Sequence, residues 1–373
     1  MSEINHTRRR ILGAAGATTV AAMLGDSLFS QSQVAAAQAG ELLRWGVVGT
    51  GGIANSMAGM MKAADAATIA AVSSRRMATA TEFAERHDVE HRFDSWQEMI
   101  DSDHVDAIYV ATPTSVREEI CIAAANGGKH VLGEKPFASL PSVNRIVAAC
   151  RDSDVAFMDG THFVHHPRTL DIKQNRAARL GAVWSVASAF QFNLPDRGNI
   201  RYNTELEPMG AIGDAGWYNM RAAVEYLPVN VNLDAVSAYL RRDEQTGAAI
   251  GGSGVLKFTD GSTSTWNCGF DSGAVVMDLR ITGDKGVINI DNFLSQNPDG
   301  SADFQYRQGG GGGGANEAVN IASAKPGAVL MFEDMAAAAA DPALRDQWMS
   351  ATVRTQALLD AAWMAALHGE KSS

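Results

Sequence analysis

The chain contains 373 residues, of which 46% are hydrophobic and 20% are charged, so it is long enough to bury two sizeable hydrophobic cores. Its formal net charge of -11 argues against a nucleic-acid partner, because no basic patch stands out to offset repulsion by phosphate groups. After the N-terminal region, no segment has the long uncharged apolar run that crossing a bilayer requires. Composition therefore argues against nucleic acid and against membrane insertion after the N-terminal region is removed.

Residues 1–39 are predicted to be an export signal. The pair Arg8-Arg9 precedes an apolar stretch over 11–24, and Ala37-Gln38-Ala39 offers a cleavage site of small residues. Twin arginines with a hydrophobic residue two places on favour the Tat route, which exports folded proteins. An ordinary Sec signal or a basic tail is the alternative. We therefore expect a periplasmic or otherwise exported protein.

Residues 40–160 are predicted to form a Rossmann-type, doubly wound parallel sheet, which makes this part of the chain α/β. Strand patterns alternate with helix patterns along the segment, and strands joined by crossover helices pair in parallel. The first expected strand begins at Leu43, and the later ones cover 68–72, 91–93, 105–111, 130–133 and 155–158. The first expected helix follows the first strand, and the second covers 77–87. The third begins after a Ser95 cap, and the last two cover 115–126 and 144–150.

The turn after the first strand has the Gly-x-Gly-x-x-Ala pattern of a dinucleotide-binding turn. Its first glycine permits a tight turn, its second lets backbone N–H groups approach a pyrophosphate, and the small last residue lets the helix pack against the strand. The predicted cofactor-binding residues of this turn are Gly49, Gly51, Gly52, Ile53 and Ala54. A glycine-rich turn without a ligand is the alternative.

The end of the second strand indicates which dinucleotide binds. Ser73-Ser74-Arg75 lies about 20 residues after the turn, where the ribose is read. A site selective for NAD places an acidic residue there, which would repel a 2′-phosphate, and this chain has none. Hydroxyl groups and a guanidinium suit a phosphate dianion, so NADP is expected rather than NAD. A solvated arginine pair that opens the next helix is the alternative.

Residues 161–373 are predicted to form an α+β substrate domain on an open, mostly antiparallel sheet. Extended segments are expected over 183–192, 235–240, 254–258, 262–268, 275–281 and 287–290, with Asp260-Gly261 as a hairpin turn. Helices are expected over 213–227 and 342–368, and Gly369 is the expected stop of the second. The glycine run 309–314 is predicted to be a flexible loop, because it lacks the strand–helix context of a phosphate site.

Three residues are the candidates for catalysis. Lys135 follows a strand end, in the crevice where open α/β sheets bind ligands, and can reach toward nicotinamide and substrate. Asp214 and Tyr218 lie four residues apart and therefore share a helix face. Tyr218 can transfer a proton if a cation such as Lys135 depresses its pKa, and Asp214 is assigned to orienting Lys135 or a substrate hydroxyl. A random exposed lysine, a helix cap and a core tyrosine are the alternatives.

Together these motifs resemble the Gfo/Idh/MocA family, named for glucose–fructose oxidoreductase and inositol dehydrogenase. The glycine turn, Ser73-Ser74-Arg75, Ala111-Thr112-Pro113, Glu134-Lys135-Pro136 and Asp214-x-Gly-x-Tyr218 occur in the order and spacing of that family. The resemblance implies that Thr112, Pro113, Glu134 and Lys135 contact the cofactor. It also implies a second-domain sheet that often forms dimer contacts, so we expect a homo-oligomer through that sheet.

Departures from the family pattern bear on the substrate. Many members have His where Tyr218 stands, and Tyr here is similar to the glucose–fructose oxidoreductase and dimeric dihydrodiol dehydrogenase branches. Val116-Arg117 stands where a His commonly follows the Thr-Pro strand end. The candidate substrate contacts are Arg201, Tyr202, His162 and Trp217. No metal is expected, because no partner carboxylate or Cys is evident near the histidines at 162, 165 and 166.

The predicted function is an NADP-dependent oxidoreductase that transfers hydride between nicotinamide and a sugar or polyol carbon. Because nucleotides are scarce outside the cytoplasm, a protein exported already folded is expected to carry its cofactor with it. Catalysis would then use two substrates, one that reduces the nicotinamide and one that reoxidises it. Two alternatives stay open: a cofactor-exchanging dihydrodiol or aldose dehydrogenase, and a nucleotide-bound sensor or binding protein without turnover.

Overall fold

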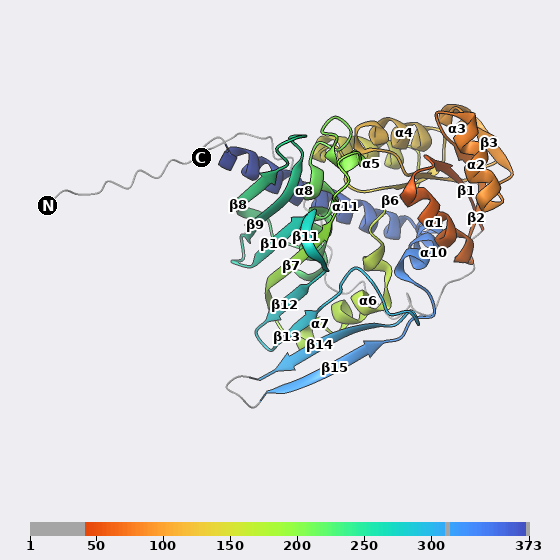
Figure 1. Ribbon diagram of the computed structural model, residues 1–373. Coiled ribbons are helices and arrows are strands. Elements are labelled where there is room, and N and C mark those ends of the chain that lie inside the picture. The colour runs from red at the N-terminus through yellow and green to blue at the C-terminus, as the bar shows by residue number, and fades with distance from the viewer. Residues whose placement is uncertain (1–41, 310–313, 371–373) are drawn as a thin grey trace. The chain divides into compact units, whose positions relative to one another are not determined.

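The computed structural model describes residues 42–309 and 314–370. The predicted export signal, with Arg8-Arg9, lies outside the described residues, as does most of the glycine run 309–314. Among the helices of these two ranges, none is both long and apolar enough to pass through a bilayer. Two β-sheets organise the described chain (Figure 1).

The first sheet is parallel, with its six strands in the order β3-β2-β1-β4-β5-β6, which confirms the predicted doubly wound fold. The strands are β1 (Leu43–Val48), β2 (Ala67–Ser73), β3 (His91–Phe93), β4 (Ala107–Val110), β5 (His130–Gly133) and β6 (Phe157–Asp159). Strand β4 reads Ala-Ile-Tyr-Val and is wholly buried, because helices cover both of its faces. The strand order reverses direction between β1 and β4, and such sheets bind ligands at the carboxyl ends of the strands at that point.

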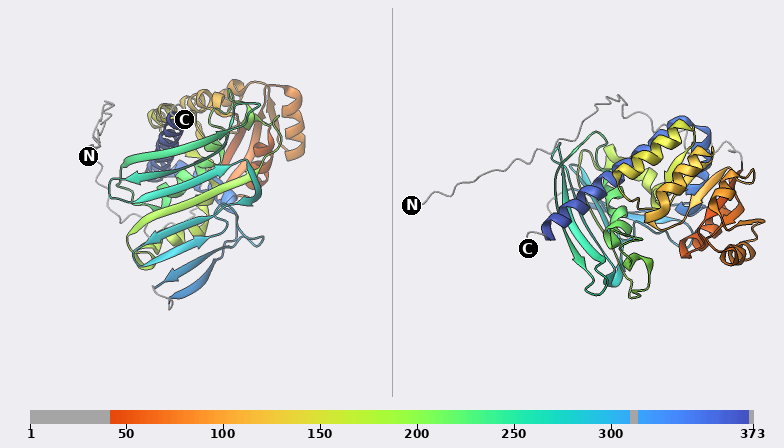
Figure 2. Two further views of the ribbon diagram at one scale, coloured as in Figure 1. Left: turned by 60° about the vertical axis from the view of Figure 1, so that its left-hand side comes forward. Right: turned by 90° about the horizontal axis from the view of Figure 1, so that it is seen from above.

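Helices cover both faces of the first sheet (Figure 2). They include α1 (Gly52–Ala63), α2 (Met77–His87), α3 (Trp96–Asp101), α4 (Thr114–Asn126) and α5 (Leu140–Asp152). Ser95 caps α3 as predicted, by accepting a hydrogen bond from the Glu98 N–H at 3.3 Å. Side chains of α3, α4 and α5 share a core with Ile108 of β4, whereas those of α1 and α2 share a core with Tyr109.

One further helix covers the first sheet although it comes late in the chain. In α10 (Gly327–Ala340), Phe332 packs edge-on against Trp45 of β1, with 5.2 Å between the ring centroids. The sequence predicts no helix here, because the segment is apolar and rich in alanine and lacks a clear polar face. The division at residue 160 stays a prediction, but the core of the first sheet includes this later segment.

The second sheet has nine strands in the order β15-β14-β13-β12-β7-β10-β9-β8, and β11 pairs with β7 off this path. The strands are β7 (Val183–Asn193), β8 (Leu233–Arg242), β9 (Ala249–Phe258), β10 (Thr263–Gly269), β11 (Asp271–Val276), β12 (Leu279–Gly283), β13 (Gly286–Ile290), β14 (Ala302–Gln308) and β15 (Ala315–Ile321). Neighbours pair antiparallel except β7 with β10, so the predicted open, mostly antiparallel sheet is confirmed. Strands β14 and β15 are not predicted from the sequence. Strand β15 is polar and mostly exposed, whereas β14 buries Ala302, Phe304 and Tyr306 in alternation with polar residues.

Helices lie behind the second sheet in the left view of Figure 2. The helix predicted over 213–227 is present as α8 (Gly210–Asp214) and α9 (Gly216–Tyr226), both buried along their whole length. The long α11 (Pro342–Glu370) packs against α9 and β8, and it also reaches α5 and β6 of the first sheet. Shorter elements are the 3₁₀ turns η2 (His162–His165) and η3 (Ile200–Tyr202) and the helices α6 (Pro167–Gln174) and α7 (Arg176–Arg179). Helix α11 therefore connects the two sheets.

Candidate active site

The glycine turn between β1 and α1 has the shape that a bound pyrophosphate requires. Gly49 has a φ of +99°, and a Cβ there would lie 2.8 Å from a backbone carbonyl oxygen, so a side chain is excluded. Apart from the chain neighbours of each glycine, no atom of the described residues lies within 4 Å of a Cβ added to Gly51 or Gly52, so the approach to the N-terminus of α1 is open in this part of the chain. Ile53 is exposed at this opening, while Ala54 is fully buried against the sheet. Unpaired N–H groups at a helix N-terminus bind anions well, so these residues fit a dinucleotide.

The predicted ribose-reading residues lie beside this turn. Thr50 Oγ1 donates to Ser74 Oγ at 3.4 Å, and Ser74 Oγ lies 2.6 Å from Thr79 Oγ1. Arg75 is exposed, whereas the side chain of Ser73 is buried. Ser74 and Arg75 therefore present a hydroxyl and a guanidinium where an NAD-selective site would carry a carboxylate.

Lys135 lies two residues after β5, and a carboxylate at the end of α8 holds its ammonium. Lys135 Nζ donates to Asp214 Oδ1 at 2.7 Å and to the Asp214 carbonyl oxygen at 2.9 Å. From η3, Arg201 Nε donates to the other carboxylate oxygen of Asp214, also at 2.7 Å. The predicted orienting contact between Asp214 and Lys135 is therefore present, and Arg201, a predicted substrate contact, joins the same cluster.

Both members of the Lys135–Asp214 pair carry charge at neutral pH. Burial disfavours the ionised form of Asp214, but Lys135 and Arg201 outweigh this and hold the pKa of the carboxyl well below its usual range. Burial likewise lowers the pKa of Lys135, but the Asp214 carboxylate raises it further, so the net shift is upward. Asp214 is thus a poor proton acceptor and is suited to orienting its two cationic neighbours.

Tyr218 lies one helical turn after Asp214, and its ring packs beside Lys135. Lys135 Nζ is 4.7 Å from the centroid of the ring, and the His162 ring is 5.8 Å from it between centroids. Burial raises the pKa of Tyr218 to about 12, although Lys135 pulls it down. Lys135 therefore lowers the pKa of Tyr218 as predicted, but burial raises this pKa by more. At neutral pH the phenol keeps its proton and can act as a donor.

Two of the predicted substrate contacts, Trp217 and Tyr202, have their polar atoms engaged elsewhere. Trp217 is fully buried, and its Nε1 donates to Thr161 Oγ1 at 2.7 Å. The Tyr202 hydroxyl donates to the Leu194 carbonyl oxygen at 2.7 Å. Trp217 has thus used its one donor, and the Tyr202 hydroxyl can only accept a further hydrogen bond. In this structure both side chains pack close to the site.

The three neighbouring histidines face separate partners. Burial and nearby Lys135 lower the pKa of His162 to about 4, so a neutral imidazole faces Tyr218. His165 Nδ1 lies 2.6 Å from Asp334 Oδ2, and His166 Nε2 lies 2.9 Å from a backbone carbonyl oxygen. Over residues 42–309 and 314–370, no group of three or more His, Cys, Asp or Glu side chains is placed to hold a metal.

Glu134 connects the lysine loop to the core of the first sheet. Its carboxylate accepts a hydrogen bond from the Tyr109 hydroxyl at 2.6 Å and one from the Lys135 N–H at 3.3 Å. The side chain is buried, and a Cβ added to Gly160 would come within 2.9 Å of it. In this structure, Glu134 therefore anchors the backbone that carries Lys135.

Arg117 connects the segments that follow β4 and β5. Its buried guanidinium donates to the carbonyl oxygens of Thr112 and Pro136 and to Thr114 Oγ1. Pro113 occupies the N-cap position of α4 between these contacts. No role of Arg117 is predicted from the sequence, where its one signal is the departure from the family pattern at Val116-Arg117.

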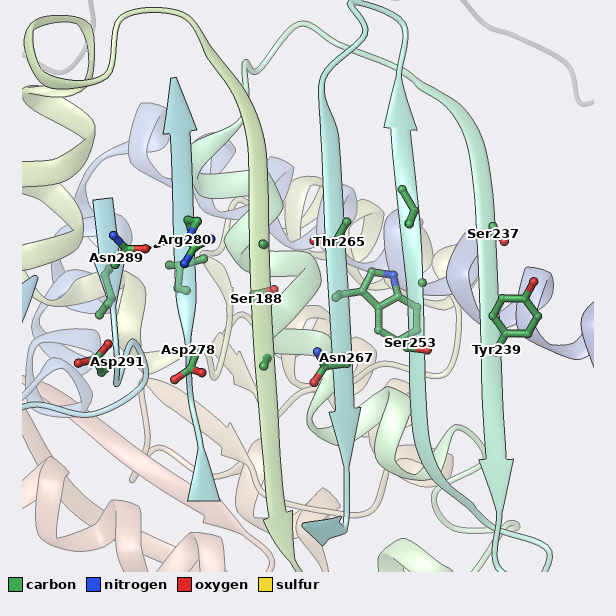
Figure 3. A pocket seen from close by; sticks show the side chains of 17 residues that line it. Ser188, Ser237, Tyr239, Ser253, Thr265, Asn267, Asp278, Arg280, Asn289 and Asp291 are labelled. Carbon is green, nitrogen blue, oxygen red and sulfur yellow. Dashed lines mark hydrogen bonds between the residues drawn. The ribbon is translucent and has the colours of Figure 1, made fainter. Parts of the chain in front are cut away.

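A hollow of about 560 Å³ lies on the second sheet and has no part in this cluster. Its lining includes Tyr239, Asn267, Asp278 and Arg280, on the face of the strands turned away from α9 (Figure 3). None of the predicted site residues lines it. The site is therefore identified by its chemistry at the strand ends and not by the size of a cavity.

Two family models match the chain. The model described as "Oxidoreductase family, NAD-binding Rossmann fold" matches residues 43–161, and the GFO/IDH/MocA C-terminal domain model matches residues 174–289. The chain is 29% identical to D-xylose 1-dehydrogenase (NADP(+)) 2 of Haloferax volcanii, over 72% of this chain and 82% of that protein. It is 31% identical to dTDP-3,4-didehydro-2,6-dideoxy-alpha-D-glucose 3-reductase of Actinomadura kijaniata, over 61% of this chain and 69% of that protein.

A solved structure has the same fold. The aldose-aldose oxidoreductase of Caulobacter crescentus superposes with a TM-score of 0.77 at 21% identity, covering 88% of this chain and 98% of that one. At this identity the match supports the fold alone. With both family models matched in order and the Actinomadura relative aligned over two thirds of its length, the chain belongs to the Gfo/Idh/MocA oxidoreductase family.

Proposed function

We propose that this protein is an NADP-dependent oxidoreductase that transfers a hydride between nicotinamide and a sugar or polyol carbon. The observation that carries the proposal is the cluster of Lys135, Asp214 and Tyr218, which lies past the carboxyl end of β5 in the sheet that carries the glycine turn. The absence of an acidic residue at Ser74 and Arg75 supports NADP. Relatives named for sugar and sugar-nucleotide chemistry support the substrate class.

The residues of this cluster are suited to transferring a proton and to hydrogen bonding with the substrate oxygen. When bound, the nicotinamide supplies or accepts the hydride. The Lys135 ammonium lies 4.7 Å from the centroid of the Tyr218 ring, and this ammonium and the Tyr218 hydroxyl are donors that can hold the oxygen of an alcohol or a carbonyl group. Asp214 fixes the direction of the ammonium and keeps it protonated.

The protonation states favour one direction of reaction at neutral pH. Because the pKa of Tyr218 is about 12, the phenol carries a proton that it can donate to a carbonyl oxygen. Oxidation requires the same group to lose that proton, so its rate should rise as the pH rises. Reduction rates that are flat from about pH 6 to 8, with oxidation rates that increase over the same range, are the expected result.

The decisive experiment identifies the nucleotide and the substrate class directly. The purified mature protein is denatured and any released nucleotide is identified by mass spectrometry, and the protein is then assayed with a panel of aldoses and polyols. Released or titratable NADP together with turnover of one of these substrates supports the proposal. A protein that binds NADP but turns over no member of the panel points to the sensor alternative.

We propose further that the protein is exported through the Tat pathway with its cofactor retained, and that it couples two sugar substrates. The support is the Arg8-Arg9 pair in the sequence and the scarcity of nucleotides outside the cytoplasm. Replacing both arginines by lysine should leave the precursor in the cytoplasm, as followed by cell fractionation. Unimpaired export of this variant favours the Sec pathway, and an empty purified protein favours the cofactor-exchanging dehydrogenase.

The outer face of the second sheet is proposed as a homo-oligomer contact. Tyr239 is 67% exposed there and Val255 is 41% exposed, on neighbouring strands of the face shown in Figure 3. Exposed apolar side chains among polar ones are typical of such interfaces. A molar mass by light scattering that falls to that of one chain in Tyr239→Asp/Val255→Asp is expected, and a monomeric wild type contradicts the proposal.

A further inference from the structure

The helix that carries the predicted catalytic residues continues as a row of ionisable side chains. Asp214, Tyr218, Arg221 and Glu225 follow one another at intervals of four, three and four residues, so they share one face of α8 and α9. All four are buried. The first two belong to the cluster described above, whereas Arg221 and Glu225 have no part in the proposed chemistry.

Arg221 forms an ion pair with the first sheet. Its Nη1 donates to Asp159 Oδ2 at 2.6 Å, and both side chains are 1% exposed. Its Nε donates to Glu225 Oε1 at 2.8 Å. Thr352 of α11 donates to the same Asp159 oxygen at 2.6 Å, and Thr161 donates to the other one. The carboxylate of Asp159 is therefore fully paired where three elements meet.

Asp159 is placed directly beside the strand that leads to Lys135. It is the last residue of β6, and in the register of the parallel pair it stands opposite Gly133, the last residue of β5. Lys135 comes two residues after Gly133, and Tyr218 comes one turn before Arg221. The bond between Arg221 and Asp159 thus connects the helix that carries Tyr218 to β6, the strand paired with the one that leads to Lys135.

We propose that the Asp159–Arg221 ion pair is a positioning element that fixes Tyr218 relative to Lys135. The inference rests on the proposed function, in which these two groups act on one substrate oxygen. A buried ion pair adds little net stability compared with apolar residues of similar size, but its direction-dependent hydrogen bonds define a single geometry. Here the pair holds α9, which carries Tyr218, against β6, and β6 is paired with the strand that precedes Lys135. A shift of α9 against this edge of the sheet would change the distance between the two side chains.

The test removes the charge of each partner. Asp159→Asn keeps the shape of the carboxylate, whereas Arg221→Gln is shorter than arginine and cannot reach both Asp159 and Glu225. The full-length enzyme with Asp159→Asn and Arg221→Gln is compared with wild type in kcat, KM and NADP affinity. Because small displacements of reacting groups cost up to about 10²-fold in rate, kcat should fall roughly tenfold to 10²-fold. NADP affinity should stay within about twofold, since the glycine turn is untouched. Arg221→Lys, which keeps the charge but cannot reach both carboxylates, should have an intermediate kcat.

A mutant cycle separates positioning from simple structural support. Tyr218→Phe and Lys135→Ala are each made in wild type and in the Asp159→Asn/Arg221→Gln background. If the pair positions these groups, each substitution lowers kcat much less in the altered background than in wild type. Losses that multiply, or a wild-type kcat for the altered pair, overturn the inference. If Arg221→Gln prevents folding, the same cycle is run with Arg221→Lys.

Two controls test whether kcat falls because any Arg–Asp pair of the first sheet is lost, or because the protein is less stable. Arg44 and Asp106 form a similar Arg–Asp pair, at 2.7 Å, in the same sheet, but at the opposite ends of the strands and partly exposed. Arg44→Gln/Asp106→Asn should leave kcat unchanged. Ile281→Val shortens a buried side chain in the core of the second sheet, so it lowers stability without touching the site, and its kcat should stay at the wild-type value. Wild-type turnover of both Tyr218→Phe and Lys135→Ala instead overturns the proposed function, and the inference with it.

Discussion

The two sheets of this protein are built differently, and the difference explains how the site is divided between them. In the first sheet, strand β4 is buried at every residue because helices cover both faces. In the second sheet, the residues of strand β8 are mostly exposed and their burial does not alternate regularly, because helices lie on one face of the sheet only. The first sheet has its functional edge at the ends of its strands. The second uses its inner face to hold a helix and leaves its outer face open.

Each sheet contributes one half of the candidate site. Lys135 comes from a strand end of the first sheet, and Asp214 and Tyr218 come from the helix that lies on the second. In the proposed function, neither half alone contains both of the groups that act on the substrate oxygen. The consequence is that the distance between the sheets, and not only the identity of the residues, should determine activity.

The largest expected effect tests whether the two halves act as one unit. Tyr218→Phe removes only a hydroxyl, and we expect turnover to fall by about 10² to 10⁴ while NADP binding is kept. Lys135→Ala should cause a similar loss, with weaker substrate binding. The double variant should be little worse than either single one, because each already disables the shared unit. Steady-state kinetics checks this, and Tyr218→Phe turnover within about threefold of wild type would exclude Tyr218 from proton transfer.

The next effect tests whether α10 is part of the first sheet's core. Phe332→Ala removes a ring that is fully buried against Trp45 and Tyr109. The free energy of unfolding should fall by about 3 to 5 kcal/mol, as for other buried aromatic truncations. Urea unfolding measures it, and Met364→Ala, at a half-exposed position, is the control. A loss under about 1 kcal/mol would mean that α10 merely covers the sheet.

Acid should weaken the two ion pairs that the buried Glu225 of α9 forms, with Lys173 of α6 and with Arg221 of its own helix. Burial raises the pKa of Glu225, but Lys173 and Arg221 outweigh it, and the pKa falls from 4.5 to about 2. A lowered folded-state pKa stabilises the protein above the unfolded value, and this stability is lost as the pH falls from 4.5 toward 2. The loss is on the order of 3 kcal/mol. Unfolding curves over this range should show it in wild type, and a parallel dependence in Glu225→Gln would refute the assignment.

The smallest expected effect concerns the first sheet alone. Ser74→Asp/Arg75→Ala should weaken NADP binding and improve NAD binding by about one to a few kcal/mol, the scale of charge-assisted hydrogen bonds. Fluorescence titration with both nucleotides measures the change. Arg76→Ala, at the neighbouring exposed arginine, is the matched control. A wild type that prefers NAD would show that the end of β2 has been misinterpreted.

The sequence predicts the first sheet well because its signals are local. Helix α2 and strands β3 and β5 have the predicted bounds, since caps, glycines and short apolar runs mark them. The cluster of Lys135, Asp214 and Tyr218 was also predicted, because a helical interval and a family motif indicate it. Strand β15 was missed because its polar sequence shows no buried face and gains order from pairing with β14. Strand β14 was missed although Ala302, Phe304 and Tyr306 alternate with polar residues, which is a local strand signal.

What the sequence could not predict depends on contacts between distant residues. Arg221 and Asp159 are 62 residues apart, and nothing local distinguishes either from a surface charge. The burial of Trp217 and Tyr202 is equally invisible, because an aromatic residue beside a site motif can face inward or outward. The upward pKa shift of Tyr218 follows from the same cause, since desolvation is a property of the assembled fold.

The late position of α10 has a consequence for how the protein is made. The core of the first sheet includes residues 327–340, so that sheet cannot complete its packing until the ribosome has synthesised nearly the whole chain. We therefore expect stable nucleotide binding to arise only after translation is almost finished, long after the N-terminus has emerged. For a precursor predicted to cross a membrane already folded, loading with cofactor would then be the last step of maturation before export.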